Sequence, residues 1–373
     1  MLTPFVLPGE VARVKPQTEK ADLIRASLAG IVSPAPARIE PACPYYQKCG
    51  GCQYQHAEYG FQVLQKREIL REQLRRVGRI DYAGEIEIIA GQPFGYRNRS
   101  QFHVVGRRIG YFEGTSHKLL AIEHCPISSP KINETLKIMR SMSRDPRFPN
   151  FLRDIELFSN EVGVQINVQR TDRPLAQRFF DWCAECIPGF VPGPLDYAAA
   201  GKLFRVSGKS FFQTNRFLLD ALVEVVLDNA QGAIALDLYA GVGLFALKLT
   251  ERFSSVLAVE QSRSAADDLE FNAERAGARI TVERKRVEEF LTASSKAPDF
   301  LVADPPRSGL GKQAADRLVR LRPRIVALVS CDPATLARDL AILVAGGYRI
   351  EKLTMIDLFP QTYHLETVAR LTQ

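Results

Sequence analysis

The second half of the chain alternates short apolar runs with stretches long enough for a helix, and this alternation limits the fold more than any other feature of the sequence. Apolar strands are expected at 234–238, 256–260, 300–303 and 325–330. Such an order of strands and helices is typical of a parallel sheet that helices cover on both faces. We therefore predict an α/β, Rossmann-like domain at residues 211–373, preceded by a mixed α+β domain at residues 42–210.

The first of these strands leads into a glycine-rich turn. Residues 236–246 read LDLYAGVGLFA, in which Gly241 and Gly243 separate a strand from the start of a helix. Glycines let a ligand approach the backbone, and a helix start offers unpaired amide donors. Glu260 ends the next strand, where a carboxylate can accept hydrogen bonds from ribose hydroxyls. The two features predict a site for an adenosine-containing cofactor, with a purely structural turn as the alternative.

A carboxylate follows a third strand. Asp304 precedes Pro305 and Pro306, which stiffen the turn and remove amide hydrogens. This arrangement suits the binding of a planar, amide-like group beside a cofactor. The alternative is a rigid loop that begins with a solvated aspartate.

A cysteine follows the fourth strand. Cys331 precedes an expected helix at 334–343, with Asp332 as its candidate cap and Pro333 at its first position. A position before a helix amino end favours the thiolate, the form that attacks carbon. We therefore expect Cys331 to be a nucleophile, and a small buried cysteine is the alternative.

A thiol nucleophile, an adenosine cofactor and a carboxylate base suit methylation at carbon 5 of uracil. This carbon is too weak a nucleophile to accept a methyl group directly. Addition of a thiolate at carbon 6 produces an enolate that can accept it, and a base then removes the carbon 5 proton so that elimination frees the enzyme. Glu366, directly before an expected strand at 367–371, is a candidate base.

Three of the seven cysteines lie within ten residues, and a fourth is available further along the chain. These candidate metal ligands are Cys43, Cys49, Cys52 and Cys125. Four thiolates suit either zinc or a [4Fe-4S] cluster, and spacing alone does not choose between them. The clustering favours a metal site in a reducing cytoplasm over a disulfide framework. Cys183 and Cys186 are expected to pack in a core.

The amino-terminal part of the chain contains short β-prone pieces and prolines. We expect strands at 5–7 and 11–14 around a turn at 8–10, then a strand or short helix at 21–32. A proline-rich linker follows. These pieces alone are too small to bury a core.

A helix is expected at 59–79, where apolar residues recur on one face. Lys66 is among the basic residues on its other faces, which we interpret as a solvated surface, with RNA contact as the alternative. Short antiparallel strands are expected after this helix, at 100–105, 108–112, 154–158, 162–168 and 203–206.

The charge balance permits a polyanionic partner. The chain has a net charge of +7 and a pI near 9.0. Arg97, Arg99, Arg107 and Arg108, interleaved with Tyr96 and Phe102, form a candidate surface for RNA phosphates and bases, with a solvated strand face as the alternative. No apolar run is long enough to span a membrane.

Several signatures occur together and in order along the chain. They are Cys43-x5-Cys49-Gly50-Gly51-Cys52 with Gln55-His56, Phe211-Phe212-Gln213-Thr214-Asn215, the Gly241 turn, Asp304-Pro305-Pro306-Arg307, Ser330-Cys331, and Phe359-Pro360 through Glu366. With these motifs the whole chain resembles the bacterial RNA uracil-C5 methyltransferases, in particular the iron-sulfur branch that modifies 23S ribosomal RNA.

The resemblance implies three domains and a set of site residues. The domains are a short, truncated TRAM/OB-like β segment with a linker at 1–41, a central iron-sulfur and RNA-binding domain at 42–210, and a class I S-adenosylmethionine-dependent methyltransferase domain at 211–373. The cofactor and target base are bound by Gln213, Tyr239, Gly241, Gly243, Glu260 and Asp304. Cys331 is the nucleophile, Glu366 accepts the proton, and Cys43, Cys49, Cys52 and Cys125 hold a [4Fe-4S] cluster.

We therefore expect a cytoplasmic monomer, without a membrane partner, that methylates carbon 5 of a uridine in 23S rRNA. The same reaction on tRNA is the first alternative. A non-catalytic RNA-binding or ribosome-assembly factor is the second, and it is disfavoured because Cys331 and Glu366 are both present.

Overall fold

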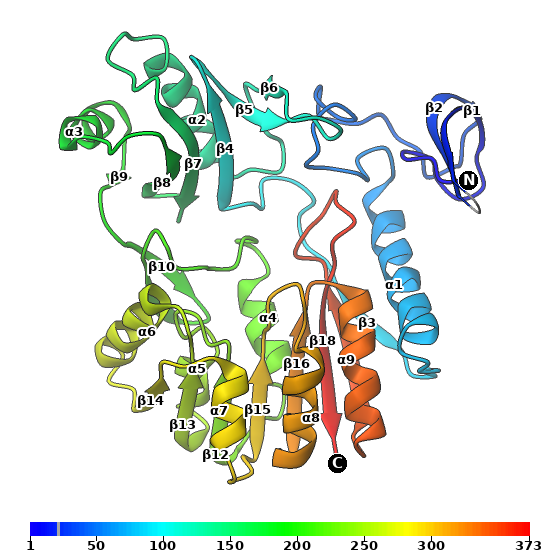
Figure 1. Ribbon diagram of the computed structural model, residues 1–373, viewed down its shortest axis with the longest axis vertical. Helices are drawn as coiled ribbons and strands as arrows, with labels where there is room; N and C mark the ends of the chain where they lie inside the picture. The colour runs from blue at the N-terminus through cyan, green and yellow to red at the C-terminus, as the bar shows by residue number, and fades with distance from the viewer. Residues whose placement is uncertain (21–22) are drawn as a thin grey trace.

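A computed structural model describes residues 1–20 and 23–373 of the chain (Figure 1). Within these residues the strands form an eight-stranded sheet, a six-stranded sheet and two two-stranded sheets. In Figure 1 the eight-stranded sheet occupies the lower part of the molecule, the six-stranded sheet the upper left and the amino-terminal hairpin the upper right.

The eight-stranded sheet has the order β14-β13-β12-β15-β16-β18-β17-β3. Its five parallel strands are β14 (Ile280–Glu283), β13 (Phe253–Val259), β12 (Gly232–Leu238), β15 (Phe300–Ala303) and β16 (Ile325–Ser330). The last strand of the chain, β18 (Glu366–Thr372), runs antiparallel between β16 and β17 (Arg349–Ile356), and β3 (Ile86–Ile89) pairs parallel with β17. The predicted α/β, Rossmann-like sheet is confirmed.

The parallel strands bury both faces, which explains their nearly continuous apolar sequences. Along β15, Phe300 and Val302 face one core cluster while Leu301 and Ala303 face the other. Helices α4 (Leu219–Val226), α5 (Ala246–Leu249) and α6 (Arg263–Arg275) contribute to the first cluster. Helices α1 (Tyr59–Arg76), α7 (Val287–Ala293), α8 (Gly311–Leu321) and α9 (Pro333–Ala345) contribute to the second.

Helix α1 corrects one sequence prediction. The helix forms where expected, but Lys66 is not on a solvated surface, since its side chain is fully buried and donates to Asp357. Helix α1 packs against α9, and β3 joins the large sheet, so this part of the predicted central segment belongs to the layers of the large sheet. The proposed division into domains stays a prediction.

The six-stranded sheet has the order β6-β5-β4-β7-β8-β9 and is antiparallel apart from the β8–β9 pair. Its strands are β4 (Arg99–Val105), β5 (Arg108–Phe112), β6 (Leu119–Ala121), β7 (Leu152–Ser159), β8 (Val164–Thr171) and β9 (Phe190–Val191). Helices α2 (Pro130–Met142) and α3 (Gln177–Cys186) pack in its core, where Cys183 is buried and Cys186 half-buried, as predicted. A hairpin of β10 (Leu195–Ala199) and β11 (Lys202–Val206) packs on the large sheet.

The amino-terminal prediction is partly wrong. Strands β1 (Val11–Lys20) and β2 (Leu23–Ser33) pair with each other, but residues 5–7 form no strand, because Phe5 has a positive φ of 66° in a turn. The expected element at 21–32 begins at residues outside the described part and continues as β2. Among the described helices, none has the length and apolar content that crossing a membrane requires.

Candidate active site

Three predicted site residues meet at one edge of the large sheet. Asp304 follows β15 and Cys331 follows β16, so both lie at the carboxyl edge of parallel strands. Glu366 begins β18, which runs antiparallel, and its neighbour Thr367 pairs with Ser330. The start of one strand and the ends of two others therefore bring the thiol and both carboxyls together, at the edge where open α/β sheets bind ligands.

Cys331 has the predicted position but not the predicted protonation. Asp332 caps α9 by accepting hydrogen bonds from the amides of Ala334 (3.0 Å) and Thr335 (2.9 Å). Burial and, to a smaller extent, the charge of Glu366 nevertheless raise the pKa of the Cys331 thiol to about 11, and Arg307 opposes them only in part. The expectation of a favoured thiolate is therefore wrong for the protein without its substrates, because desolvation outweighs the helix end.

Two buried carboxyls stand beside this thiol. Glu366 is 4% exposed, and its Oε1 atom has no hydrogen-bond partner in the described chain. Burial, together with the charge of Asp304, raises the pKa of Glu366 well above its usual value. Burial also raises the pKa of Asp304 to about 7, although Gln213 Nε2 donates to its Oδ2 over 3.0 Å. At neutral pH, Cys331, Asp304 and Glu366 are therefore protonated to a greater extent than the same side chains would be in water.

The glycine turn after β12 is shaped for close approach. Tyr239, Gly241 and Gly243 all have positive φ values, of 61°, 56° and 93°. The φ of Gly243 strains any other residue, and a Cβ atom there would also lie 2.7 Å from Cδ1 of Leu247, which would have to move. The amide of Gly241 donates to Glu260 Oε2 over 2.9 Å, and the amide of Ser262 donates to Oε1 over 2.6 Å. Both bonds fix the carboxylate at the end of β13.

A pocket of about 290 Å³ opens beside this turn. Its lining includes Tyr239 and Glu260, together with Pro306 after β15. Gln213 and Asp304 are absent from the described lining, and they are hydrogen-bonded to each other instead. Of the predicted cofactor residues, Tyr239 and Glu260 line the pocket, Gly241 and Gly243 lie in the adjoining turn outside its lining, and Gln213 and Asp304 lie beside Cys331 and Glu366.

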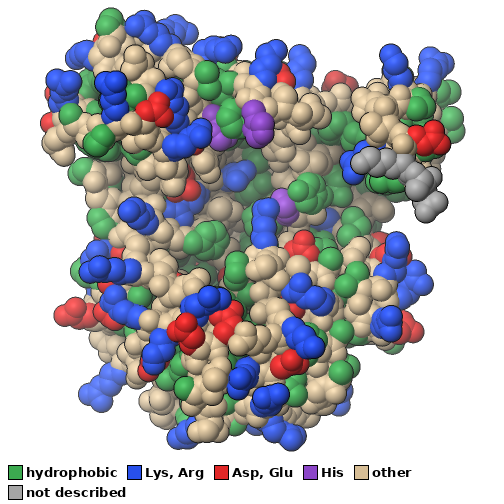
Figure 2. All heavy atoms as spheres, viewed as in Figure 1, with side chains coloured by type: hydrophobic (Ala, Val, Ile, Leu, Met, Phe, Trp, Pro, Cys, Tyr) green, Lys and Arg blue, Asp and Glu red, His purple; other side chains and the backbone are tan. Residues whose placement is uncertain are grey.

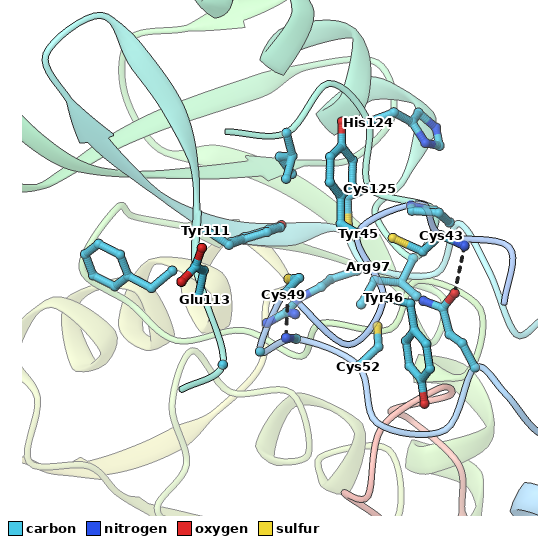
Figure 3. Close-up of a pocket in the computed structure, with 18 of the residues that line it drawn as sticks. Cys43, Tyr45, Tyr46, Cys49, Cys52, Arg97, Tyr111, Glu113, His124 and Cys125 are labelled. Carbon is cyan, nitrogen blue, oxygen red and sulfur yellow. Dashed lines mark hydrogen bonds between the residues drawn. The ribbon is translucent and has the colours of Figure 1, made fainter. Parts of the chain in front are cut away.

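The four clustered cysteines line a second cavity. It has a volume of about 420 Å³ and is bordered by Cys43, Cys49, Cys52 and Cys125, all of them free thiols. Figure 3 shows their side chains around a common space that Arg97 also enters. Among residues 1–20 and 23–373, no group of three or more His, Cys, Asp and Glu side chains is arranged as a single metal ion requires.

Two unpaired donors also line this cavity. Gln55 Nε2 and Tyr111 Oη are buried and have no hydrogen-bond partner among the described atoms. The other end of the Gln55 side chain accepts from the amide of Cys43 over 3.1 Å, so the residue is held beside the cysteine loop. Buried donors without partners are costly. The wall of the cavity therefore carries two polar atoms that make no hydrogen bond to a described residue.

The predicted RNA surface is wrong in its aromatic part. Tyr96 is 1% exposed and Phe102 0% exposed, so neither ring can stack on a base. Arg99 is also buried, where it forms an ion pair with Glu156 over 3.0 Å. Arg107 and Arg108 are exposed. The face in Figure 2 is hollowed between the two large sheets, and Lys and Arg side chains border the hollow.

Comparison with known proteins identifies the family. A family model described as tRNA (Uracil-5-)-methyltransferase matches residues 190–373. The 23S rRNA (uracil(1939)-C(5))-methyltransferase RlmD of Pectobacterium atrosepticum is 33% identical, over 98% of this chain and 87% of that protein. The chain belongs to the RNA uracil-C5 methyltransferases.

Two further comparisons agree with this family. An uncharacterized RNA methyltransferase of Aquifex aeolicus is 32% identical, over 98% of this chain and 92% of that protein. The crystal structure of Pyrococcus abyssi tRNA (uracil-54, C5)-methyltransferase in complex with S-adenosyl-L-homocysteine has a TM-score of 0.78 and 25% identity, and covers 99% of this chain and 94% of that one. This RNA uracil-C5 methyltransferase therefore shares its fold over nearly the whole length.

Sequence reasoning missed one side of the pocket in this methyltransferase. Residues 285–288, which follow β14, line it together with residues 308–311. The first segment contains Lys285 and Arg286 on one side of Val287 and Glu288 on the other. The signal was available, because the end of each parallel strand faces the same edge of the sheet. Strand β14 has only four residues, too few to give a clear apolar run in the sequence.

Proposed function

We propose that this enzyme methylates carbon 5 of a uridine in 23S rRNA, with S-adenosylmethionine as the methyl donor. The observation that carries the proposal is the meeting of Cys331, Glu366 and Asp304 at one sheet edge, next to the pocket of the glycine turn. The choice of 23S rRNA is supported by the RlmD relatives, which are 33% and 30% identical to this chain.

The cofactor would be held by the turn after β12. Tyr239, Glu260 and the glycines at 241 and 243 form a cradle whose carboxylate can accept ribose hydroxyls. When bound, S-adenosylmethionine supplies an electrophilic methyl group on a positively charged sulfonium. A positive charge nearby favours the ionised form of a carboxyl. The raised pKa values of Asp304 and Glu366 therefore describe the protein before the cofactor arrives.

The first covalent step is addition of Cys331 to the ring. The half-buried thiol gives its proton to solvent, its sulfur bonds to carbon 6, and the π electrons of the carbon 5–carbon 6 double bond move toward the carbonyl oxygen at carbon 4. Gln213 and Asp304, which are hydrogen-bonded to each other, are placed to hold the amide-like edge of the base. The thiol must lose its proton for this addition, because the thiolate is the form that attacks carbon.

The second half of the reaction needs a base. After carbon 5 has received the methyl group, the Glu366 carboxylate removes the remaining carbon 5 proton, the double bond re-forms and the sulfur of Cys331 leaves. A buried carboxylate with an unpartnered oxygen is a strong proton acceptor, since no hydrogen bond stabilises its charge.

We also propose that the four cysteines hold a [4Fe-4S] cluster. A tetrahedral zinc site with Zn–S distances of about 2.3 Å brings its sulfurs closer together than a cluster does. The cavity of about 420 Å³ that the four thiols border supports the larger group. Gln55 and Tyr111 offer donors for its sulfides. The cluster would tie the 43–52 loop to Cys125 and takes no part in methyl transfer.

The N-terminal hairpin is proposed to contribute to RNA binding, as a TRAM-like β segment. Arg13 and Arg25 are exposed on paired strands β1 and β2. Exposed arginines suit contact with phosphates. In Figure 1 this hairpin lies at the same end of the molecule as β5, whose Tyr111 and Phe112 line the cysteine cavity.

The experiment that tests the proposed function is mapping of 5-methyluridine in total RNA from cells with and without this gene. The proposal expects loss of the modification at one 23S rRNA uridine, restored by the wild-type gene and not by Cys331→Ala. Loss from tRNA alone would establish the alternative substrate. Unchanged modification in both RNAs would contradict the proposal.

A further inference from the structure

The loop that precedes Glu366 accepts hydrogen bonds from several distant segments of the chain. This loop, residues 357–365, joins β17 to β18 and ends at Glu366. Four consecutive carbonyls accept hydrogen bonds from different parts of the chain: Leu358 from Asn215 (3.0 Å), Phe359 from Lys66 (2.9 Å), Pro360 from Tyr96 (3.0 Å) and Gln361 from the amides of Gln53 (2.9 Å) and Tyr54 (3.0 Å). A loop that was only a connection would leave such carbonyls to water.

Lys66 makes the most specialised of these contacts. Its ammonium lies 2.6 Å from Asp357 Oδ1, and both side chains are fully buried. Burying an ion pair costs desolvation that its attraction often fails to offset, so such a pair is better explained by the geometry it fixes than by stability. The Lys66 ammonium therefore donates to the loop at two points, the Asp357 carboxylate and the Phe359 carbonyl.

Gln62 lies one turn before Lys66 on α1 and forms hydrogen bonds with the same loop. Its Nε2 donates to Gln361 Oε1 over 3.0 Å, and its Oε1 accepts from the amide of Gln361 over 3.2 Å. Gln361 has a φ of 69°, a left-handed conformation that side chains rarely adopt. The reciprocal pair therefore holds the loop in a backbone shape that it would not keep alone.

The position of Glu366 depends on this loop. Its Oε1 atom has no partner among the described residues, so hydrogen bonds at that atom do not set the position of the carboxyl. The backbone of Glu366 pairs with Ile356, the residue directly before Asp357. Lys66 therefore anchors the chain one residue from the ladder position opposite Glu366.

We propose that Lys66 and Gln62 are positioning residues, which hold Glu366 where it can remove the carbon 5 proton. The inference rests on the proposed function and adds two residues of helix α1 to it. Sequence analysis had placed one of them, Lys66, on the solvated side of that helix. It makes a specific claim about the reaction: loosening the loop slows the elimination step and leaves the addition of Cys331 to the RNA intact.

The test compares the two steps in one assay. Lys66→Met is mixed with S-adenosylmethionine and 23S rRNA transcript, and the RNA–protein adduct on a denaturing gel is followed together with methylated RNA released. We expect turnover to fall about 10- to 100-fold, as a misplacement near 1 Å does, while adduct forms at the wild-type rate and accumulates. Lys137→Met, the same substitution at an exposed position of α2, is expected to behave as wild type.

Further variants keep the test decisive. Lys66→Met leaves the Asp357 carboxylate buried without its partner. The double variant Lys66→Met with Asp357→Asn also removes that unpaired charge. Gln62→Met removes only hydrogen bonds between uncharged groups. Both are expected to accumulate adduct. A parallel fall of adduct formation and turnover in all three variants, or unchanged turnover, would overturn the inference.

Glu366→Gln separates this inference from the proposed function. If Glu366→Gln accumulates adduct and the α1 variants do not, the positioning role is wrong and the proposed mechanism stands. If Glu366→Gln turns over normally or forms no adduct, the proposed mechanism fails, and the positioning role fails with it.

Discussion

The sheet edge and the cysteine cavity differ in how their residues are held. At the sheet edge, Asp304, Cys331 and Glu366 sit at the ends of paired strands, and their positions follow from the fold. Around the cavity, Cys43, Cys49 and Cys52 lie in a segment without helix or strand. The positions of the first group are therefore set by strand pairing, whereas those of the second are set by a loop.

The strongest way to test this difference is to remove the nucleophile. Cys331→Ala is expected to lower turnover at least ~10⁴-fold, because no other group can supply the covalent step. Since the edge is formed by strands, the variant should fold and bind S-adenosylmethionine as wild type does. Tritium transfer measures turnover, and calorimetric titration measures the binding of S-adenosylmethionine.

Cys186→Ala is the matched control, because this half-buried cysteine lies in the core of the six-stranded sheet. It should keep full activity. Normal turnover of Cys331→Ala would contradict the assignment of the nucleophile.

Removal of the base should have the next largest effect. Glu366→Gln is expected to slow turnover ~10²- to 10⁴-fold, the usual contribution of a general base, because the amide cannot accept the carbon 5 proton. Steady-state methylation measures the loss. Glu224→Gln, at an exposed position of α4, serves as control. A loss no greater than in Glu224→Gln would exclude Glu366 as the base.

Changes at the cysteine cavity should affect thermal stability more than the rate of methylation. Protein purified without oxygen is expected to hold about four irons per chain, since each such cluster contains four, and Cys125→Ser should lose them. The 43–52 loop then loses a tie to the six-stranded sheet, so the midpoint of thermal unfolding should fall. Iron analysis and calorimetry under argon check both. Zinc in the wild-type protein, or equal iron in both proteins, would contradict the cluster.

The smallest expected effect is a gain in stability at the sheet edge. Burial raises the pKa of Asp304 to about 7, so the folded protein keeps a proton that the unfolded chain releases near pH 4. The free energy of unfolding from this group therefore falls as pH rises between about 4 and 7. Asp304→Asn, which needs no proton, should raise the unfolding midpoint at pH 8 by several degrees and leave it almost unchanged at pH 4. An equal gain at both values would refute this.

The sequence was sufficient to predict the positions of residues that follow the ends of strands. The apolar runs at 300–303 and 325–330 match β15 and β16, and Asp304 and Cys331 follow from them. The protonation of Cys331 could not be predicted, because a capping motif is local while burial and the charge of Glu366 come from distant segments.

The contacts of α1 were out of reach for the same reason. Lys66 and Asp357 are separated by 291 positions, and a lysine among arginines on a helix normally faces water. The burial of Tyr96 and Phe102 was missed too, since an alternation of aromatic and basic residues does not reveal which side faces the core.

The central claim is a transient bond between Cys331 and carbon 6 of a uridine, and RNA that contains 5-fluorouridine tests it directly. Fluorine at carbon 5 cannot leave as a proton does, so the wild-type enzyme should stop after methyl transfer. Mass spectrometry of the digested complex should find methylated fluorouridine on the peptide that contains Cys331. A complex linked through another residue, or no covalent complex while ordinary RNA is methylated, would contradict the account.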